Sequence, residues 1–152
     1  MRVIVQRSRS SNVTIDGTQV GQIDYGLVLL VGFTKGDSIK EIEYLAKKIM
    51  NLRIFDDDNG VMNRSLLDVG GSILSISQFT LYANTAKGNR PSYVDALGST
   101  EASPLYDLFN EKLREYGIAV KTGIFGADMV VNINNDGPVT ILLESGDSNA
   151  KE

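Results

Sequence analysis

Apolar and polar residues alternate along the first part of the chain. Residues 2–16 and 18–33 carry β-branched side chains at alternate positions or in short apolar runs, interrupted at Asp16-Gly17 and at Tyr25-Gly26. A period of two with such interruptions is typical of strands joined by tight turns. The chain is therefore predicted to begin as a β-meander.

The apolar spacing changes to three and four residues in two later segments. Residues 38–53 predict a helix that begins with a capping box, because a serine is followed three positions later by a glutamate. A second helix is predicted with Ser103 as its cap and Pro104 as its first residue, ending at Gly117. Its apolar face would contain Leu105, Leu108, Phe109, Leu113 and Tyr116.

Short apolar runs and turn residues alternate in the rest of the sequence. Residues 53–60 predict a short strand running into a turn, and residues 70–79 predict a strand followed by a polar, glycine-rich loop to about Gly98. Loops of that length are often functional. Residues 118–145 predict two strands around a turn with the sequence NDGP, and residues 146–152 form a polar tail expected to fray.

These elements together predict one α+β domain over residues 1–145. Its sheets are expected to be mostly antiparallel and barrel-like, with two main helices. Two helices leave much of such a sheet uncovered, so apolar faces or edges remain for a second copy of the chain. We therefore expect a homodimer.

The composition limits the available chemistry. The 152 residues include no histidine and no cysteine, which excludes a Ser-His-Asp triad, a cysteine nucleophile and the usual zinc ligands. We expect no metal and no cofactor. The net charge of −4 argues against a protein that grips long stretches of phosphate backbone. The sequence shows neither a signal-peptide pattern nor a membrane-spanning apolar run, so a cytoplasmic protein without membrane contact is expected.

Ser77, Gln78, Phe79 and Thr80 stand where a buried strand is predicted to end. Their hydroxyls and amide can donate and accept hydrogen bonds, and backbone N–H groups at a strand end are unpaired. Fixed donors of this kind can form an oxyanion hole. The same hydroxyls can instead cap the next turn, so both interpretations stay open at this point.

Two later segments contain candidate ligand-binding residues. Gly137 permits a close backbone approach, and a cis bond before Pro138 would turn two carbonyls toward a ligand, although an ordinary hairpin turn is the alternative. Phe125 and Met129 lie beside small residues. They could wall a pocket for an aromatic base or an apolar side chain, or they could belong to the core.

Three segments of the sequence are more informative about function together than each is alone. SQFTLYA, GNRPSY and NDGPVT, in this order and spacing, resemble the signature segments of the D-aminoacyl-tRNA deacylases, also called D-tyrosyl-tRNA(Tyr) deacylases. The similarity runs from RVIVQR through TGIFGADM to the final strand. It implies a cytoplasmic, homodimeric hydrolase that cleaves the ester between a D-amino acid and the terminal ribose of tRNA, and thereby keeps the wrong chirality out of translation.

The resemblance also implies where the site lies. Residues 77–80 would line the ester end of the substrate, while a cis Gly137-Pro138 peptide would reach in from the other subunit and face the α-carbon. The remaining substrate-binding residues would be Phe125, Met129, Val139 and Thr140. The aminoacylated 3′ end of tRNA is thus the expected partner.

Our hypothesis for the mechanism is substrate-assisted. An aminoacyl ester is already activated, and the neighbouring ribose 2′-hydroxyl can orient or deprotonate the attacking water, so no histidine is required. N–H groups near Phe79 and Thr80 would hold the oxyanion, and the carbonyls of Gly137 and Pro138 would hold the ammonium. An L-residue would then drive its side chain into the Gly-Pro backbone, whereas a D-residue, or glycine on a mischarged tRNA, would pass.

Three alternatives remain open. Thr80 could be a covalent nucleophile, although the sequence supplies no visible base for it. The chain could be a non-catalytic dimeric binding module for a tRNA 3′ end or a small anionic ligand. A general esterase with a hydroxyl nucleophile would cleave L- and D-esters equally.

Overall fold

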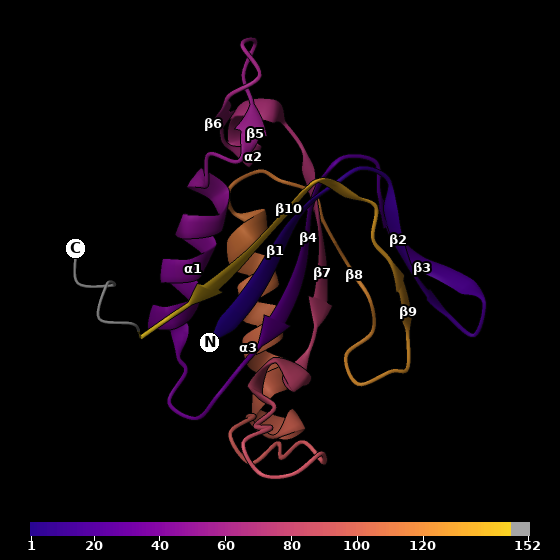
Figure 1. Cartoon of the computed structure of the whole chain (residues 1–152), viewed down its shortest axis with the longest axis vertical. Coiled ribbons are helices and arrows are strands. Elements are labelled where there is room, and N and C mark those ends of the chain that lie inside the picture. Colours follow the sequence, from indigo (N-terminus) through magenta and orange to yellow (C-terminus); the bar gives the residue numbers. More distant parts are fainter. Residues whose placement is uncertain (147–152) are drawn as a thin grey trace.

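Three sheets and two long helices form most of the computed structural model, which describes residues 1–146 (Figure 1). The strands of the larger sheet, in spatial order, are β10 (Asn135–Glu144), β1 (Arg2–Ser8), β4 (Gly26–Gly32), β7 (Ser72–Ser77) and β8 (Val120–Thr122). β1 is antiparallel to both of its neighbours, whereas β4, β7 and β8 run parallel to one another. The predicted α+β domain is confirmed, but this sheet is mixed rather than mostly antiparallel.

The smaller sheet has three antiparallel strands. Its spatial order is β3 (Thr18–Ile23), β2 (Ser11–Ile15) and β9 (Val130–Asn132). The Asp16-Gly17 turn joins β2 to β3 as predicted, with both residues at positive φ. The predicted meander is nevertheless wrong, because β1 and β4 pair with each other in the larger sheet. An alternating pattern identifies a strand but not its partner.

A two-stranded hairpin completes the β structure. β5 (Phe55–Asp56) and β6 (Met62–Arg64) flank the turn predicted around Gly60, which has a φ of 74°. None of the three sheets closes into a barrel among the described residues, so the barrel-like description is not retained.

Helix α1 (Ile39–Asn51) begins at the predicted capping box. Ser38 Oγ accepts from the Lys40 amide at 3.3 Å, and Glu41 Oε2 accepts from the Ser38 amide at 2.8 Å. These contacts satisfy two of the N–H groups that a helix start leaves free. Two shorter helical segments are α2 (Leu66–Val69) and the 3₁₀ turn η1 (Phe79–Tyr82).

Helix α3 (Ser99–Arg114) begins five residues before its predicted first residue. The prediction of Ser103 as cap and Pro104 as first helical residue is wrong, since Pro104 lies inside the helix. Ala102, only 7% exposed, packs into the core and gives the first turn tertiary contacts. Pro104 is exposed and removes one backbone hydrogen bond without placing its ring in a packed contact.

The buried face of α3 is also rotated from the predicted one. Tyr106 and Asn110 are buried, whereas Tyr116 is 39% exposed. Phe109 and Leu113 belong to both the predicted and the observed face.

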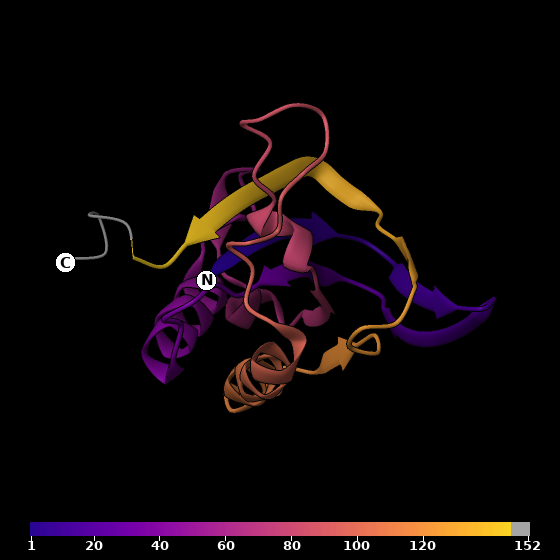
Figure 2. The ribbon, with the colours of Figure 1, turned by 90° about the horizontal axis from the view of Figure 1, so that it is seen from below.

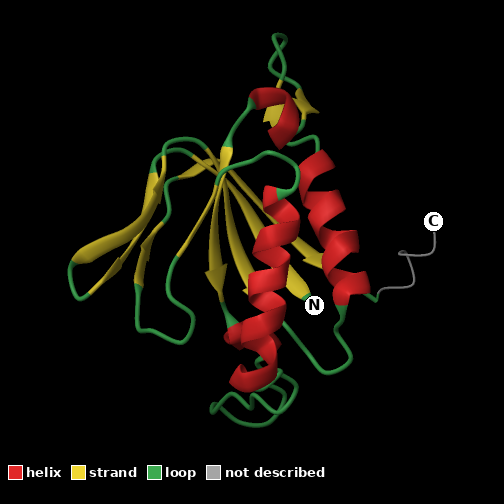
Figure 3. Cartoon of the chain, turned by 180° about the vertical axis from the view of Figure 1, so that it is seen from behind, coloured by secondary structure: helices red, strands yellow, loops and turns green. Residues whose placement is uncertain are grey.

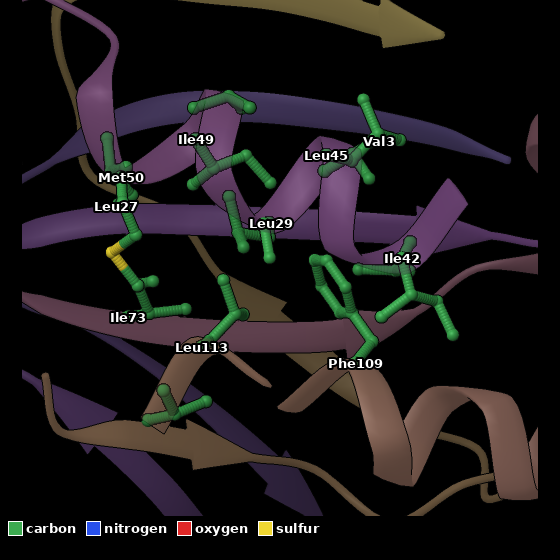
Figure 4. Close-up of a cluster of buried hydrophobic side chains, with 14 of the residues drawn as sticks. Val3, Leu27, Leu29, Ile42, Leu45, Ile49, Met50, Ile73, Phe109 and Leu113 are labelled. Carbon is green, nitrogen blue, oxygen red and sulfur yellow. The ribbon is translucent and has the colours of Figure 1, made fainter. Parts of the chain in front are cut away.

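Both long helices cover the same face of the larger sheet (Figure 3). The main core lies between them, and Figure 4 shows its side chains meeting from strands and helices. Fully or almost fully buried contributors are Val3, Leu27, Leu29, Ile42, Leu45, Ile49, Met50, Ile73, Phe109 and Leu113. Each side chain of this size stabilises the fold by about 1.5–3 kcal/mol through its burial.

The opposite face of the larger sheet is covered only in part. The smaller sheet packs over β4 and β7 through a second cluster of Val13, Ile23, Val28, Leu74 and Ile76. Ile4, Leu30 and Leu142 lie side by side across β1, β4 and β10 on that face. Leu142 is 56% exposed, so β10 presents an apolar position on an edge strand.

The last third of the chain forms three strands rather than the predicted two. The NDGP sequence lies at the start of β10 instead of in a turn between paired strands, because β9 and β10 belong to different sheets. Within the described residues, no helix is long and apolar enough to cross a membrane. The predicted tail falls largely at 147–152, outside the described residues.

Candidate active site

A cavity of about 600 Å³ opens where β4 and β7 end. The two strands are parallel, so their carboxyl ends meet at one edge of the sheet, where Val31 of β4 pairs with Ser77 of β7. The beginning of α3, with Gly98 and Ser99, and the segment after β8 form the other walls. Ligand sites commonly lie at such an edge.

Ser77 and Gln78 stand at the point where β7 leaves the sheet. The Gln78 amide still donates to the Val31 carbonyl at 2.7 Å, and the Leu81 amide donates back to the Gln78 carbonyl at 3.3 Å, which starts η1. Between these bonds, the amide N–H groups of Phe79 and Thr80 have no hydrogen-bond acceptor among residues 1–146. Two adjacent backbone donors are therefore free at this point, the first on Phe79, which lines the cavity, and the second on Thr80, which does not.

The Thr80 side chain is not one of the cavity walls. Its hydroxyl instead accepts a short hydrogen bond from Gln78 Nε2. This bond orients the Gln78 amide, which does line the cavity. Thr80 therefore orients the Gln78 side chain, and among residues 1–146 no basic side chain is hydrogen-bonded to the Thr80 hydroxyl.

Two aromatic residues form the rim of the cavity. Phe79 is 54% exposed and Tyr93 is 41% exposed, and their rings meet edge to face with centroids 5.1 Å apart. Tyr93 comes from the long loop between η1 and α3, which extends past the end of the sheet at the bottom of Figure 1 and arches out at the top of Figure 2. Bridges of Asn84 with Ser92 and of Thr34 with Ala96 fasten this loop.

Phe125 and Met129 line the same cavity as Ser77, as the pocket interpretation of these residues expected. Met129 lies over Gly123, where a Cβ atom would collide with the methionine sulfur. Asp128 is exposed and is the one charged side chain among the lining residues. The walls are otherwise apolar or neutral, which suits a substrate with an apolar portion.

Gly137-Pro138 lies at the other end of the larger sheet. The peptide is cis, as the resemblance implied, and both residues are exposed. Through Ser8 of β1, Asn135 aligns with Gly26 at the start of β4, whereas Ser77 aligns with Val31 at its end. Gly137-Pro138 lies between Asn135 and Thr140, which aligns with Val28 through Gln6, so about four residues along the strands and three strand spacings put the peptide roughly 20 Å from Ser77 within one chain.

Arg7 fixes the backbone around this peptide. The side chain is nearly buried, and its guanidinium donates to the Asp136 carbonyl at 3.1 Å and to the Ile54 carbonyl at 2.9 Å. A Cβ at Gly137 would lie 3.1 Å from Arg7 Nη2 and 2.8 Å from a Val139 methyl. Together with a φ of 127°, these contacts require glycine at position 137.

Asn135 holds the same segment from the other side. Its side-chain oxygen accepts from the Val139 amide at 3.2 Å, and its side-chain nitrogen donates to Thr140 Oγ1 at 2.9 Å. Thr140 also accepts from Gln6 at 3.2 Å. The exposed Gly-Pro peptide is thus carried on a densely hydrogen-bonded support.

The cavity of one chain gathers only part of the predicted site. Ser77, Gln78, Phe79, Phe125 and Met129 line it. Thr80, Gly137, Pro138, Val139 and Thr140 do not. Sequence reasoning missed Arg7, Tyr93, Ala102 and Asp128, of which Tyr93 lies in the signature segment GNRPSY and Asp128 in the similar stretch TGIFGADM, so both offered a signal.

The described residues contain no cluster of carboxylates suited to a metal ion.

Near η1, the Arg2 guanidinium stacks over the ring of Tyr82 at 4.5 Å and donates to the Leu81 carbonyl at 2.9 Å. Burial, reinforced by the charge of Asp37, raises the pKa of Tyr82 to about 12. These contacts anchor the turn that carries the free amides.

Free strand-end amides beside a mostly apolar cavity are donors of the kind with which a hydrolase can stabilise an acyl oxyanion. The chain belongs to the D-Tyr-tRNA(Tyr) deacylase family, whose model matches residues 4–144. The family expected from the three sequence segments is therefore confirmed.

Individual relatives agree with this membership. The chain is 59% identical to the D-aminoacyl-tRNA deacylase of Brevibacillus brevis over 95% of its own length and 100% of the relative. It is 56% identical to the enzyme of the same name from Bacillus thuringiensis, over 95% and 99%. These names confirm the expectation of a hydrolase.

Solved structures give the same fold. The "c-Myc DNA Unwinding Element Binding Protein" superposes with a TM-score of 0.91 at 41% identity, covering 97% of this chain and 100% of that one. A structure described as "a probable eukaryotic D-amino acid tRNA deacylase" has a TM-score of 0.80, covering 93% and 97%. At 17% identity, the second likeness concerns the fold alone.

Proposed function

We propose that the protein hydrolyses the ester bond of D-aminoacyl-tRNA, and of mischarged glycyl-tRNA, in the cytoplasm. Water adds to the acyl carbon, the bond to the ribose oxygen breaks, and a free D-amino acid and tRNA result. Full-length similarity to the deacylases supports this proposal. The observation that carries the mechanism is the pair of free amides at Phe79, which lines the cavity, and at Thr80, the next residue in the chain.

The chemistry assigns main-chain roles to the protein. The Phe79 and Thr80 amides would donate to the oxyanion, and the 2′-hydroxyl of the substrate would orient the attacking water. Phe125 and Met129 would hold the apolar part of the substrate or its terminal adenosine. Thr80 is disfavoured as a nucleophile, because its hydroxyl is already bound to Gln78 and lies outside the cavity walls.

A homodimer would complete the site. The Gly137-Pro138 peptide is exposed, firmly supported and far from the cavity of its own chain. We infer that it enters the cavity of a second subunit, where its carbonyls meet the substrate ammonium, with Val139 and Thr140 supporting it. The partly uncovered face of β1 and β10, with exposed Leu142, offers the apolar surface for this contact.

The chirality of the substrate tests the activity. Purified protein should shorten the lifetime of the ester in D-Tyr-tRNA, and of glycyl-tRNA, while L-Tyr-tRNA should decay at its uncatalysed rate. An unchanged lifetime for all three would indicate a non-catalytic binding module. Equal acceleration of the D- and L-esters would indicate a general esterase.

Subunit mixing tests the shared site. Gly137→Ala and Phe79→Pro each damage one half, the second by removing a proposed donor amide. Each homodimer should be inactive, whereas statistical mixing gives half heterodimers with one intact site, or about a quarter of wild-type activity. Absence of any recovery, with heterodimers verified by mass, would contradict the shared site.

A further inference from the structure

A loop that carries two cations ends beside the rim of the cavity. The backbones of Asn84 and Ser92 close it with hydrogen bonds of 2.8 and 2.9 Å, and Tyr93, the next residue, lines the cavity. The residues between this pair include Lys87 and Arg90 and no carboxylate. All of them are exposed, and Figure 2 shows the loop arching out from the rest of the chain. This segment, which we call the basic loop, is thus a positively charged surface fastened to the cavity rim.

The charges of the basic loop are not neutralised within the described residues. Among residues 1–146, neither Lys87 nor Arg90 forms an ion pair. Asp95, the first acid after the loop, lines a separate polar hollow together with Arg2. Asp128 lines the cavity itself. Both cations of the loop are therefore available to an anion.

Exposed aromatic rings stand at the foot of the basic loop. Phe79 is 54% exposed and Tyr93 is 41% exposed, and both line the cavity. Proteins that hold single-stranded nucleic acid combine such rings with cations, because bases stack on the rings while phosphates bind the cations. The rim and the loop together offer both kinds of group.

The proposed substrate continues beyond the cavity. A space of about 600 Å³ has the size of a small-molecule site and suits an aminoacyl-adenosine. The tRNA chain goes on from the 5′ oxygen of that adenosine through a phosphodiester, so the preceding phosphates and bases lie outside. Three residues of chain span at most about 10 Å, which keeps Arg90 within that distance of Tyr93 at the rim. A contact this short also agrees with a net charge of −4.

We propose that Lys87, Arg90 and Tyr93 form a subsite for the unpaired nucleotides that precede the terminal adenosine of the substrate. The two cations bind the phosphates of these nucleotides, and the Tyr93 ring stacks on a base. This inference rests on the proposed deacylase function of the cavity. The subsite gives the enzyme a preference for an ester carried on RNA over the same ester on a lone nucleoside.

The acidic hairpin β5–β6 of a second subunit is the alternative occupant of the basic loop. The two carboxylates at its turn are already engaged within their own chain. Asp58 pairs with Arg64 at 3.0 Å, and Asp57 accepts from the amides of Asn59 and Val61 at 2.9 and 3.0 Å. RNA phosphates are therefore the occupant that the charges favour.

The double variant Lys87→Gln/Arg90→Gln tests the phosphate contacts with two substrates. D-Tyr-tRNA contains the proposed nucleotides, whereas 3′-O-(D-tyrosyl)adenosine has the same ester and no phosphate. At about 50 mM salt, we expect kcat/KM to fall about tenfold for D-Tyr-tRNA and by less than about twofold for the adenosine ester. The matched control is Lys40→Gln/Lys47→Gln, which removes the same charge from exposed positions on α1, away from the cavity, and should leave both values within about twofold.

The salt dependence of KM reports the number of phosphate contacts. Each contact with a single strand adds about 0.7 to the slope of log affinity against log salt concentration, so two contacts add about 1.4. Between about 50 and 200 mM salt, the KM of the wild-type protein for D-Tyr-tRNA should therefore rise about sevenfold more than that of the double variant. The KM for the adenosine ester should rise equally little in both proteins.

Substitution of Tyr93 tests the stacking contact. Tyr93→Leu removes the ring and should raise the KM for D-Tyr-tRNA at least about fivefold more than the KM for the adenosine ester. Tyr93→Phe keeps the ring and should leave both KM values within about twofold of wild type. A tyrosine that only supports the rim would affect the two substrates equally.

Three results would overturn the proposal. One is an equal loss of kcat/KM for both substrates in the double variant, and another is a wild-type KM for D-Tyr-tRNA that does not depend on salt. The third is dissociation of the double variant into single chains, seen by sedimentation, which would assign the basic loop to a contact between subunits. Absence of turnover of both substrates by the wild-type protein would instead contradict the proposed function itself.

Discussion

The two ends of the larger sheet carry the segment around Ser77 and the Gly137-Pro138 peptide, and the backbone is hydrogen-bonded very differently at the two ends. At the Ser77 end, two backbone amides have no acceptor among residues 1–146, and two exposed aromatic rings stand beside a cavity. At the Gly137 end, hydrogen bonds from Arg7 and Asn135 hold the backbone, and the Gly-Pro peptide projects without a cavity. On the proposed arrangement, the Ser77 end receives the ligand, and the Gly137 end has to be rigid because it enters the cavity of a second subunit.

The largest expected effect is at Gly137. In Gly137→Ala, the new methyl meets Val139 and Arg7, so the rigid end must shift, and a displacement of about 1 Å at a reacting centre costs about 100-fold. We expect kcat/KM for D-Tyr-tRNA to fall by at least that factor. Gly36→Ala is the control, because Gly36 also has a positive φ but has nothing within 4 Å of its added methyl. Equal losses of kcat/KM in the two variants would show that activity does not depend on the contacts around Gly137 in particular.

Arg7→Lys should lower kcat/KM less than Gly137→Ala does, by loosening the backbone that supports the Gly-Pro peptide. A lysine cannot donate simultaneously to the carbonyls of Ile54 and Asp136, and one charge-assisted hydrogen bond contributes about 1.5 kcal/mol, or roughly tenfold in kcat/KM. Arg9→Lys is the matched control, since Arg9 binds the Asp136 carboxylate from an exposed position. Steady-state kinetics of both variants should show a clear loss for Arg7 alone.

Thr80→Ala, at the cavity end of the sheet, should lower kcat only slightly. It removes the bond that orients Gln78 but leaves the backbone amides, so kcat should stay within about tenfold of wild type. Single-turnover assays with acid quenching check both the rate and the absence of an acyl-enzyme. A labelled acyl group trapped on Thr80 would establish the covalent mechanism instead.

Ser38→Ala should affect stability without affecting the site. Loss of the N-cap of α1 should lower the free energy of unfolding by about 1 kcal/mol, measured by urea denaturation. Turnover of D-Tyr-tRNA should not change, because α1 contributes no residue to the cavity. A large loss of activity would show that the helices and the site are coupled.

Alkaline pH should produce the subtlest effect. The folded-state pKa of Tyr82, about 12, exceeds its ordinary value of 10.0. The stability linked to Tyr82 is therefore fully present below pH 10 and is lost as the pH rises toward 12. Thermal unfolding of Tyr82→Phe should depend less on pH over this interval than that of the wild-type protein.

Local signals in the sequence predicted local structure well. The capping box at Ser38 and the turn at Asp16-Gly17 form as expected, because neighbouring residues determine both. The start of α3 was missed because Ala102 is held by distant core residues. The predicted turn at Gly137 failed because strand partners depend on the whole sheet.

The candidate site, like the fold, was predicted only in part. Ser77, Gln78, Phe125 and Met129 were predicted and meet around one cavity, although they come from segments far apart in the chain. Arg7 was missed because it acts on backbone carbonyls distant in sequence. Ordinary-looking polar residues of this kind acquire their role only from tertiary neighbours.

The separation of Gly137-Pro138 from the cavity has a practical consequence. On the proposed arrangement, a lone subunit contains both halves of the site but cannot bring them together. Specific activity then depends on protein concentration, and dilution below the dissociation constant of the dimer should abolish turnover while each chain stays folded. Assays performed at low enzyme concentration would underestimate the catalyst that a cell contains.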